Sequence, residues 1–388
     1  MVRILSQLFA AVLVLAAAGA LAAKVNILGF WWENPIPFQQ TPRNLKSIRA
    51  EDCATCHAEI YKEWKASTHA HALSDLQFQA EMSKSPQTNW LCLNCHTPLR
   101  NQVPEYAESV NNKSARQPVL VKNPANDPVL RAEAVTCAVC HIRDGAIIGP
   151  TGSKLAPHPV KKDPEMLQAS CGQCHQATAD YGETLICTFD TYQEWKSSPY
   201  AAKGQTCASC HMPVVSRPVA AGGPARQVHR HTFGGGLIPK TLGEPAPAHR
   251  SGLSVEIVNT VVGKDSVTLQ VRLKNAEAGH KLPTGDPERH IRVDVKLFAD
   301  GKAVGVRSIR IGQQWEWYPK PRRIADTRMT PMEERIEKLA FPIKTIGAFR
   351  AEIVVTNVRM TEEAAKYHHL LGRYPLEARV QNFNVTVR

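Results

Sequence analysis

The sequence predicts an α+β protein of two unlike parts, mainly short helices and loops first and an antiparallel β-sandwich second. Five copies of the pattern Cys-x-x-Cys-His lie between Cys53 and His211, and none follows. From about residue 253 the chain instead contains runs in which apolar and polar residues alternate, which is typical of strands with one buried face. The 388 residues, 43% of them apolar, suffice for two or three domains.

The first 23 residues predict an exported protein. Arg3 precedes an apolar run that ends in small residues at Ala20 and Ala22. This pattern is typical of a secretory signal peptide, here residues 1–23, and predicts a periplasmic or extracellular location. The alternative is an uncleaved segment that would attach the protein to a membrane. Lys24 interrupts the apolar run and favours cleavage.

The five repeated patterns use ten of the eleven cysteines. They are CATCH (Cys53, Cys56, His57), CLNCH (Cys92, Cys95, His96), CAVCH (Cys137, Cys140, His141), CGQCH (Cys171, Cys174, His175) and CASCH (Cys207, Cys210, His211). This is the attachment signature of c-type haem, in which the two thiols bind the vinyl groups and the histidine ligates the iron. The sequence therefore predicts five covalently attached haem c groups.

Other uses of paired cysteines explain the pattern less well. Zinc sites need four ligands and do not require a histidine directly after each second cysteine. Thioredoxin-like redox pairs occur singly, and disulfides do not repeat a five-residue signature. Five haems between Cys53 and His211 also leave little protein for each one. We therefore expect short helices and loops around a haem stack that does not fold without its cofactors.

Ten further histidines are candidates for the second iron ligand, which would keep the potential low and close the iron to substrates. His69 is the strongest candidate because it follows the helical stretch EIYKEWKAST, with His71 as the runner-up. His158 lies in the proline-flanked segment APHPV. His231 is preferred to His229 because it abuts a run of three glycines.

The remaining histidines are less clearly assigned. His280, in AGHKLPTG between two predicted strands, is the fourth candidate distal ligand. For the fifth haem His249, His290, Met212 and no ligand at all remain open. We interpret His368 and His369, on the amphipathic stretch TEEAAKYHHLLG, as structural residues.

Residues 50 to 235 resemble the multihaem cytochrome c family of the cytochrome c-554 type. The resemblance is carried by CATCHAEIYKEWKASTH, CLNCHTPL, CAVCHIRDGAIIGP, CGQCH and YQEWKSSPYAAKGQTCASCHMP. It implies that the histidine after the Trp-x-x-Ser phrase, here His69, is a haem ligand, and that the protein shuttles electrons between redox proteins. Relatives with this haem arrangement reduce nitrogen or sulfur oxyanions. The family type has four haems, whereas this chain has five motifs and a C-terminal extension.

The C-terminal part predicts about seven strands. The alternating runs are SVEIVNTVV, SVTLQVRL, HIRVDVKLFA, KAVGVRSIRIG, RAEIVVTNVRM and EARVQNFNVTVR, with a predicted hairpin turn at Asp300-Gly301. We expect the loop AGHKLPTGDPERH to dock this part on the haem-binding part through His280. The stretch QQWEWYPKPRR covers a haem edge, binds propionates or docks a partner, or else it is an ordinary strand end.

These observations give a domain plan and a function. We expect a signal peptide (1–23), a pentahaem cytochrome domain (24–245) and a β-sandwich (246–388). The formal charge of +12 is partly offset by haem propionates and favours acidic redox partners, while export argues against nucleic acid. Electron transfer, rather than enzymatic activity, is the leading hypothesis. The alternatives are a reductase at a haem with an open coordination position, and a self-assembling extracellular cytochrome polymer.

One phrase occurs twice. LICTFDTYQEWKSSPYA resembles CATCHAEIYKEWKASTH, and an ungapped alignment on Trp64 and Trp195 places Cys187 under Cys56 and Tyr200 under His69. The shared Tyr-x-Glu-Trp-Lys helix is interpreted as scaffold that can exist without a haem of its own. Cys187 is not predicted to be a sixth attachment site.

Overall fold

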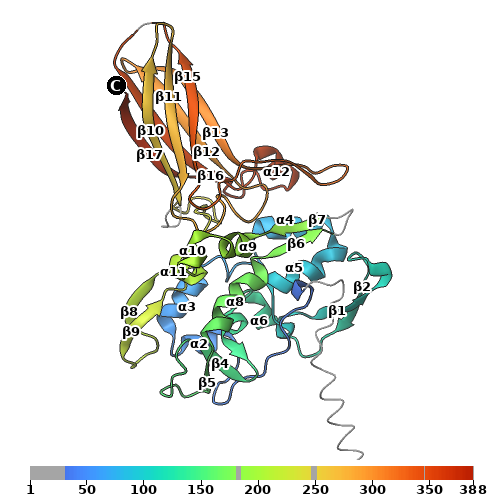
Figure 1. Ribbon diagram of the computed structural model, residues 1–388. Coiled ribbons are helices and arrows are strands. Elements are labelled where there is room, and N and C mark those ends of the chain that lie inside the picture. Colours follow the sequence, from blue (N-terminus) through green and yellow to red (C-terminus); the bar gives the residue numbers. More distant parts are fainter. Residues whose placement is uncertain (1–30, 181–184, 246–250, 345, 388) are drawn as a thin grey trace, which may run out of the picture.

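The computed structural model describes residues 31–180, 185–245, 251–344 and 346–387. The predicted signal peptide (1–23) and His249 lie outside the described residues. Figure 1 shows an N-terminal part of helices and small sheets, on which an elongated C-terminal part of long strands stands. The prediction of a mixed α and β chain is confirmed. Within the described ranges, no helix combines the length and apolar character that a membrane span requires.

The helices of the N-terminal part are short, and α8 is the longest with 11 residues. Isolated helices below about 12 residues are marginal in water, so these depend on tertiary contacts. They are α2 Ala50–Ala54, α3 Ala58–Lys65, α4 Leu76–Lys84, α5 Asn89–His96, α6 Pro128–Ala132, α7 Cys137–His141, α8 Pro164–Cys174, α9 Thr191–Lys196, α10 Pro199–Ala202 and α11 Cys207–His211. Single 3₁₀ turns occupy Trp31–Glu33, Pro86–Thr88, Arg100–Gln102 and Asn111–Lys113.

Short strands in the segments between these helices form small sheets. The strands are β1 Glu105–Val110, β2 Pro118–Lys122, β3 Ile142–Arg143, β4 Ala146–Gly149, β5 Val160–Lys162, β6 Ala177–Asp180, β7 Leu185–Phe189, β8 Val214–Pro218 and β9 Ala225–His229. They form the hairpins β1-β2, β6-β7 and β8-β9 and the three-stranded sheet β3-β4-β5. The buried apolar side chains nearby form separate small clusters, around Trp90, around Leu130 and around Trp64. Among the described residues, the N-terminal part thus has no single large apolar core of its own.

The C-terminal part contains two antiparallel sheets, with strand orders β10-β11-β15 and β14-β13-β12-β16-β17. The strands are β10 Leu253–Val262, β11 Ser266–Asn275, β12 His290–Ala299, β13 Lys302–Glu316, β14 Arg322–Asp326, β15 Glu334–Pro342, β16 Phe349–Val358 and β17 Glu377–Val387, with α12 Glu362–Tyr367 before the last strand. The six alternating runs that the sequence predicts as strands all form strands.

Both sheets contribute to one apolar core. Alternate side chains of β11, such as Leu269, are buried together with alternate side chains of β12 and β16, such as Val293 and Ile353. β14 and β15 are additional strands that the sequence interpretation missed. Along β15 only Phe341 is buried. The charged residues of this strand obscure the alternation of apolar and polar residues by which a strand is recognised.

The turn between β12 and β13 is the predicted hairpin. Asp300 and Gly301 both adopt positive φ angles, 49° and 77°. Two successive residues at positive φ match a type I′ turn, whose twist suits antiparallel strands. Ala299 accordingly pairs with Lys302 directly across the turn.

A buried polar cluster joins the two parts of the chain. The Asp75 carboxylate caps the first turn of α4, accepts a hydrogen bond from the Tyr374 hydroxyl at 2.6 Å and lies 2.7 Å from the Lys240 ammonium. Burial raises the pKa of Asp75, but Lys240 and the hydrogen bonds outweigh burial, so its pKa lies below the ordinary 3.8. Burial lowers the pKa of Lys240 to about 8. Lys240 therefore loses its charge above about pH 8, whereas the Asp75 carboxylate stays ionised to below its ordinary pKa, so the ion pair exists between these limits.

Asp75→Asn is expected to destabilise the folded protein by roughly 2 kcal/mol at pH 6, because it leaves the largely buried Lys240 without its carboxylate. Asparagine preserves the helix cap. The lowered pKa of Asp75 means that its contribution is present above pH 3.8 and is lost as the pH falls through the folded-state pKa. Denaturant unfolding followed by circular dichroism should show the difference from wild type shrink below pH 4 and above pH 8. Asp163→Asn, which changes the cap of α8, is the matched control; an equal loss in both variants would contradict the ion-pair argument.

Candidate functional site

The five Cys-x-x-Cys-His motifs are numbered I to V in chain order. Positions i, i+3 and i+4 of a helix lie on one face, so a helical motif presents both thiols and the histidine together. Motifs III and V form the whole of α7 and α11, and motifs II and IV end α5 and α8. Motif I begins in α2, and its histidine, His57, precedes α3. None of the eleven cysteines forms a disulfide.

Backbone carbonyl groups fix the orientation of four motif histidines. The Nδ1 atoms of His57, His96 and His141 lie 2.8, 2.7 and 2.9 Å from the carbonyl oxygens of Val219, Ala72 and Ile148. Nδ1 of His211 likewise contacts the carbonyl oxygen of Gly234. When Nδ1 donates to a carbonyl group, Nε2 remains free as a metal ligand.

Three motif histidines face a second histidine from elsewhere in the chain. The ring centroids are 6.3 Å apart for His175 and His69, 6.1 Å for His141 and His231, and 6.1 Å for His211 and His280. Nδ1 of His231 and of His280 also contacts a backbone carbonyl oxygen, of His229 at 3.0 Å and of Lys281 at 2.9 Å. Each pair leaves room for one metal ion between the rings, with metal–imidazole bonds of about 2 Å.

Burial keeps these imidazoles in the neutral form that ligates metals. It lowers the pKa of His69 to about 3 and the pKa values of His175 and His231 to about 4. The pKa values of His141 and His280 are lowered for the same reason. These five rings therefore carry lone pairs at neutral pH, and the donor set of the pairs suits haem iron.

The other predicted ligands occupy different surroundings. Burial, and then the charge of nearby His57, lower the pKa of His158, which places His158 in the neighbourhood of motif I. The exposed His71 and His229 contact backbone carbonyl oxygens, and His290 begins β12. His368 is buried 3.4 Å from Glu81, and His369 is exposed.

Motif II differs from the paired sites. Its His96 ring stacks on Phe78, with centroids 3.5 Å apart and planes 5° from parallel. Asp75 and Lys240 are its charged neighbours. In the part of the chain that the structure describes, no second histidine ring faces His96.

Thiols of different motifs lie next to one another. The thiols of Cys53 and Cys137, of Cys95 and Cys174, and of Cys171 and Cys207 lie near enough for one to shift the pKa of the other. The hydroxyl group of Ser170 also lies 3.7 Å from the Cys140 thiol, which brings motif III beside motif IV. Motifs I, III and IV therefore follow one another in space, and motifs II and V both adjoin motif IV.

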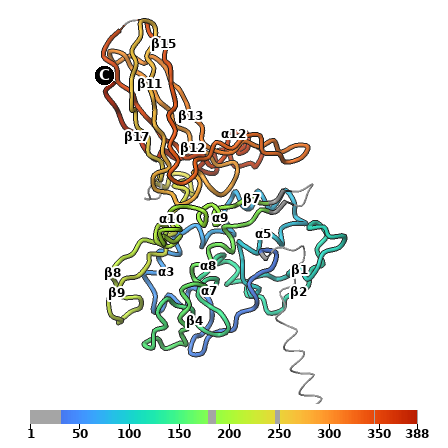
Figure 2. Tube along the Cα trace, viewed as in Figure 1, coloured from blue at the N-terminus to red at the C-terminus, as the bar shows by residue number. Residues whose placement is uncertain are grey.

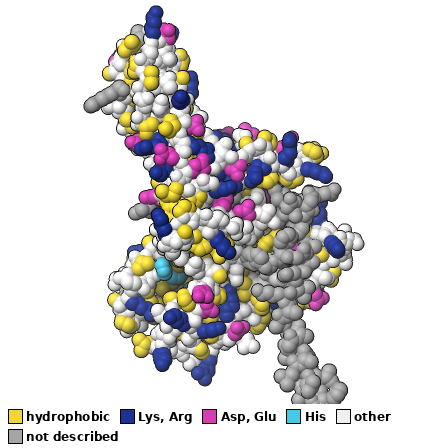
Figure 3. Space-filling model, in the orientation of Figure 1, with side chains coloured by type: hydrophobic (Ala, Val, Ile, Leu, Met, Phe, Trp, Pro, Cys, Tyr) yellow, Lys and Arg dark blue, Asp and Glu magenta, His cyan; other side chains and the backbone are white. Residues whose placement is uncertain are grey.

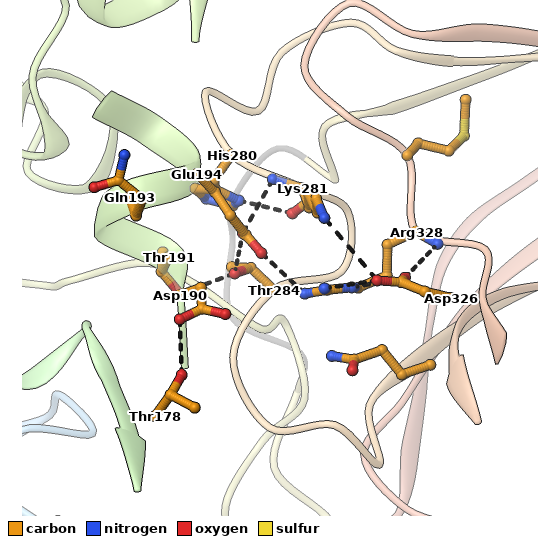
Figure 4. A network of polar contacts seen from close by, with 12 residues as sticks. Thr178, Asp190, Thr191, Gln193, Glu194, His280, Lys281, Thr284, Asp326 and Arg328 are labelled. Atoms are coloured by element: carbon orange, nitrogen blue, oxygen red, sulfur yellow. Dashed lines mark hydrogen bonds and ion pairs between the residues drawn. The ribbon is translucent and has the colours of Figure 1, made fainter. Parts of the chain in front are cut away.

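The loop that carries His280 is held by α9, as Figure 4 shows. The Glu194 carboxylate accepts hydrogen bonds from the Thr284 hydroxyl at 2.7 Å and the Lys281 N–H at 3.3 Å. It also forms an ion pair with Arg328 at 2.9 Å, in which both side chains are 7% exposed. Figure 2 shows α9 and α10 directly beneath the strands of the C-terminal part. The loop 278–290 thus lies at the contact between the two parts of the chain.

The space-filling view shows the surface of the molecule in the orientation of Figure 1. Figure 3 shows a histidine side chain within a hollow of the N-terminal part, bordered by hydrophobic side chains. At the junction of the two parts, charged side chains of both signs gather.

The stretch around Trp315 lies in the β13-β14 hairpin, where Trp315 stacks on Trp317 and Tyr318 is 85% exposed.

The structure corrects the ungapped alignment of the repeated phrase. Cys187 lies in strand β7, not in a turn like that of Cys56. The N–H of Tyr192 donates to the carbonyl oxygen of His175 at 3.0 Å, just as the N–H of Tyr61 donates to that of His57 at 2.9 Å. The helix α9 therefore follows motif IV as α3 follows motif I, with the β6-β7 hairpin inserted between. The interpretation of α9 as a helix without a haem motif of its own was wrong in this respect.

Comparison with known proteins agrees with this site. Residues 52–142 match the family model described as cytochrome c554 and c-prime. The structure resembles that of a penta-heme cytochrome c552 from Thermochromatium tepidum, with a TM-score of 0.58, 19% identity and coverage of 88% of this chain and 99% of that one. A β-glucosidase from Kluyveromyces marxianus aligns with a TM-score of 0.15 and 13% identity over 37% of this chain and 16% of that one. A TM-score this low does not indicate a shared fold. A search of curated proteins finds no match.

The family match covers motifs I to III, and the structural likeness extends over the two-part fold. Residues 52–142 are thus similar to the cytochrome c554 and c-prime family, and the chain shares its fold with the penta-heme cytochrome c552.

Proposed function

We propose that this protein transfers electrons between redox partners through five covalently bound haems, most of them with two histidine ligands. The observation that carries this proposal is the set of three histidine pairs with ring centroids 6.1 to 6.3 Å apart. Two histidine ligands fill both axial positions of an iron and close it to substrates, which suits electron transfer rather than chemistry on a bound molecule. Bound haem supplies the one-electron redox chemistry of its iron.

Each residue of a paired site has a distinct role in this proposal. The two motif cysteines would hold the cofactor, and the motif histidine and the facing histidine would both ligate its iron. The ligand pairs are His175 with His69, His141 with His231 and His211 with His280, and we assign His158 to His57 at motif I. Carbonyl contacts of Nδ1 keep five of these rings in the ligating tautomer, namely His57, His141, His211, His231 and His280.

The contacts between motifs support a proposed route for the electrons. We propose the sequence of sites I, III and IV, from which sites II and V branch. The adjacent thiols Cys53 and Cys137, Cys95 and Cys174, and Cys171 and Cys207 support it, because attached haems at neighbouring motifs lie close together. Site IV is then the branch point.

Site II supports a second candidate function. Phe78, rather than a histidine, packs against His96, and Lys240 provides a nearby positive charge. A haem held at this site by Cys92, Cys95 and His96 would supply the chemistry to reduce a small nitrogen or sulfur oxyanion, with electrons that reach it from the redox partner through site IV. A high-spin signal that accounts for one haem would support this reductase function.

We also propose the wider setting of the protein. Residues 24–245 form the pentahaem domain and residues 246–388 a β-sandwich, supported by the shared core of the two C-terminal sheets. Export to the periplasm or beyond the cell rests on the signal sequence, and acidic redox partners suit the formal charge of +12. Self-assembly into a polymer is the alternative use of the exposed histidines, and light scattering that detects only monomers would exclude it.

The test is a haem-to-protein ratio combined with electron paramagnetic resonance of the purified holoprotein. We expect five haems per chain, with low-spin signals from at least four. A ratio clearly below five, or high-spin signals from most of the haems, would overturn the proposal. The two measurements also separate the two functions, because the electron-transfer function requires no high-spin haem.

A further inference from the structure

The helices α3 and α9 are repeated copies of one local structure. Each contains a tyrosine whose N–H donates to the carbonyl oxygen of a motif histidine, Tyr61 to His57 in α3 and Tyr192 to His175 in α9. Within each helix the tyrosine and tryptophan rings meet in the same way, at 5.6 Å and 44° in α3 and at 5.4 Å and 48° in α9. The two copies therefore place their Glu-Trp pairs equivalently.

The tryptophan of each copy binds the segment just before another attachment motif. Nε1 of Trp64 donates to the carbonyl oxygen of Val135 at 2.8 Å, and Nε1 of Trp195 donates to that of Gln205 at 2.9 Å. Both acceptors lie two residues before the first cysteine of a motif, Cys137 of site III in one case and Cys207 of site V in the other. Each helix thus fixes the start of one motif.

The glutamate of the same copy binds the backbone at the facing histidine. Glu63 accepts the N–H of His231 at 2.9 Å and pairs with Arg217 through two contacts of 2.8 and 2.7 Å. Glu194 accepts the N–H of Lys281, directly after His280, and pairs with Arg328. The glutamate side chains are only 11% and 7% exposed. Charge-assisted hydrogen bonds are short and strong, so each buried glutamate holds the backbone group that it binds in a fixed orientation.

Close packing supports the second copy. A Cβ atom on Gly279, the neighbour of His280, would lie 3.4 Å from the Trp195 ring and 3.3 Å from Cβ of Tyr200. The Tyr200 hydroxyl, at the position that His69 takes in the first copy, donates to the carbonyl oxygen of Ala276 at 2.5 Å. The loop with His280 therefore lies directly on α9 and α10.

We propose that the Tyr-x-Glu-Trp-Lys helix is a repeated clamp that aligns both sides of a single haem. Its tryptophan positions the attachment motif and its glutamate positions the distal histidine, at site III through Trp64 and Glu63 and at site V through Trp195 and Glu194. At site V the distal histidine belongs to the C-terminal part, so the clamp also couples docking of that part to iron ligation. This inference rests on the proposed haem ligation, and Glu63 and Glu194 are positioning residues that do not touch the cofactor.

The test uses the holoprotein with Glu63→Ala and Glu194→Ala, each paired with its Gln variant. We expect each Ala variant to convert part of one haem from low spin to high spin and to let the reduced protein bind carbon monoxide at that haem. The difference spectrum of Glu63→Ala should match that of His231→Ala, and that of Glu194→Ala should match His280→Ala. Glutamine keeps a hydrogen-bond acceptor, so the Gln variants should lie between the Ala variants and wild type. Because the two sites are distinct, the double Ala variant should show the sum of the single effects.

Glu59→Ala, on the exposed face of α3, is the matched control and should leave spin state and carbon monoxide binding unchanged. If both Ala variants keep wild-type spin states and carbon monoxide binding, the glutamates support only the fold and the clamp is refuted. If an Ala variant fails to fold, its Gln partner decides by the same readouts. Failure of the ligation proposal itself would be visible in the wild type, as missing low-spin signals or a low haem ratio.

Discussion

His280→Met is expected to raise the reduction potential of one haem by on the order of 0.2 V, because a methionine ligand stabilises ferrous iron more than a histidine ligand does. His280 faces His211 at 6.1 Å, so the change should affect site V alone. A spectroelectrochemical titration should show one of the redox transitions move to higher potential while the others stay in place.

His369→Met is the matched control for this experiment, because His369 is an exposed histidine of the same C-terminal part. It should leave every redox transition where the wild type has it. An unchanged titration of His280→Met would show that His280 does not ligate iron. A shift of several transitions together would show instead that the substitution disturbs the whole haem domain.

Phe341→Ala is expected to destabilise the two-sheet part by roughly 3–5 kcal/mol, because it leaves a cavity in a core that cannot fully collapse. Phe341 is the fully buried side chain of β15 and belongs to the core that both sheets share. Denaturant unfolding monitored by circular dichroism in the far ultraviolet measures the loss.

Phe298→Ala removes the same number of atoms from a half-buried position on β12. The Phe298 ring carries the Arg350 guanidinium group over its face, 4.0 Å from the centroid. Losing this contact should cost only about 1 kcal/mol. Equal destabilisation by the two variants would mean that β15 does not close the core as described.

The Cys-x-x-Cys-His motifs can be recognised in the sequence because the chemistry that they indicate is local. Two thiols and one imidazole must meet a single haem, and five consecutive residues such as Cys137 to His141 meet that requirement without help from the rest of the chain. The long strands were predictable for a similar reason, since alternation along β11 and β12 reports a single buried face. The strand β15 escaped because only Phe341 among its residues is buried.

The assignment of histidines to motifs was decided by the tertiary structure. The sequence identified His69, His231 and His280 as candidate ligands. It did not predict that they face His175, His141 and His211, from which they are separated by 106, 90 and 69 positions along the chain. Such pairs are fixed by how the short helices pack, and no local pattern encodes that packing.

The repeated phrase shows the same division. The shared Tyr-x-Glu-Trp-Lys residues were enough to predict that α3 and α9 are similar helices. Only the fold decided that α9 follows motif IV across an inserted hairpin, because the hydrogen bond from Tyr192 to His175 spans residues that the sequence separates by 17 positions. Each Cys-x-x-Cys-His motif is thus contained in a single short segment of this chain, whereas the histidine pairs depend on contacts between distant segments, which exist only once the chain has folded.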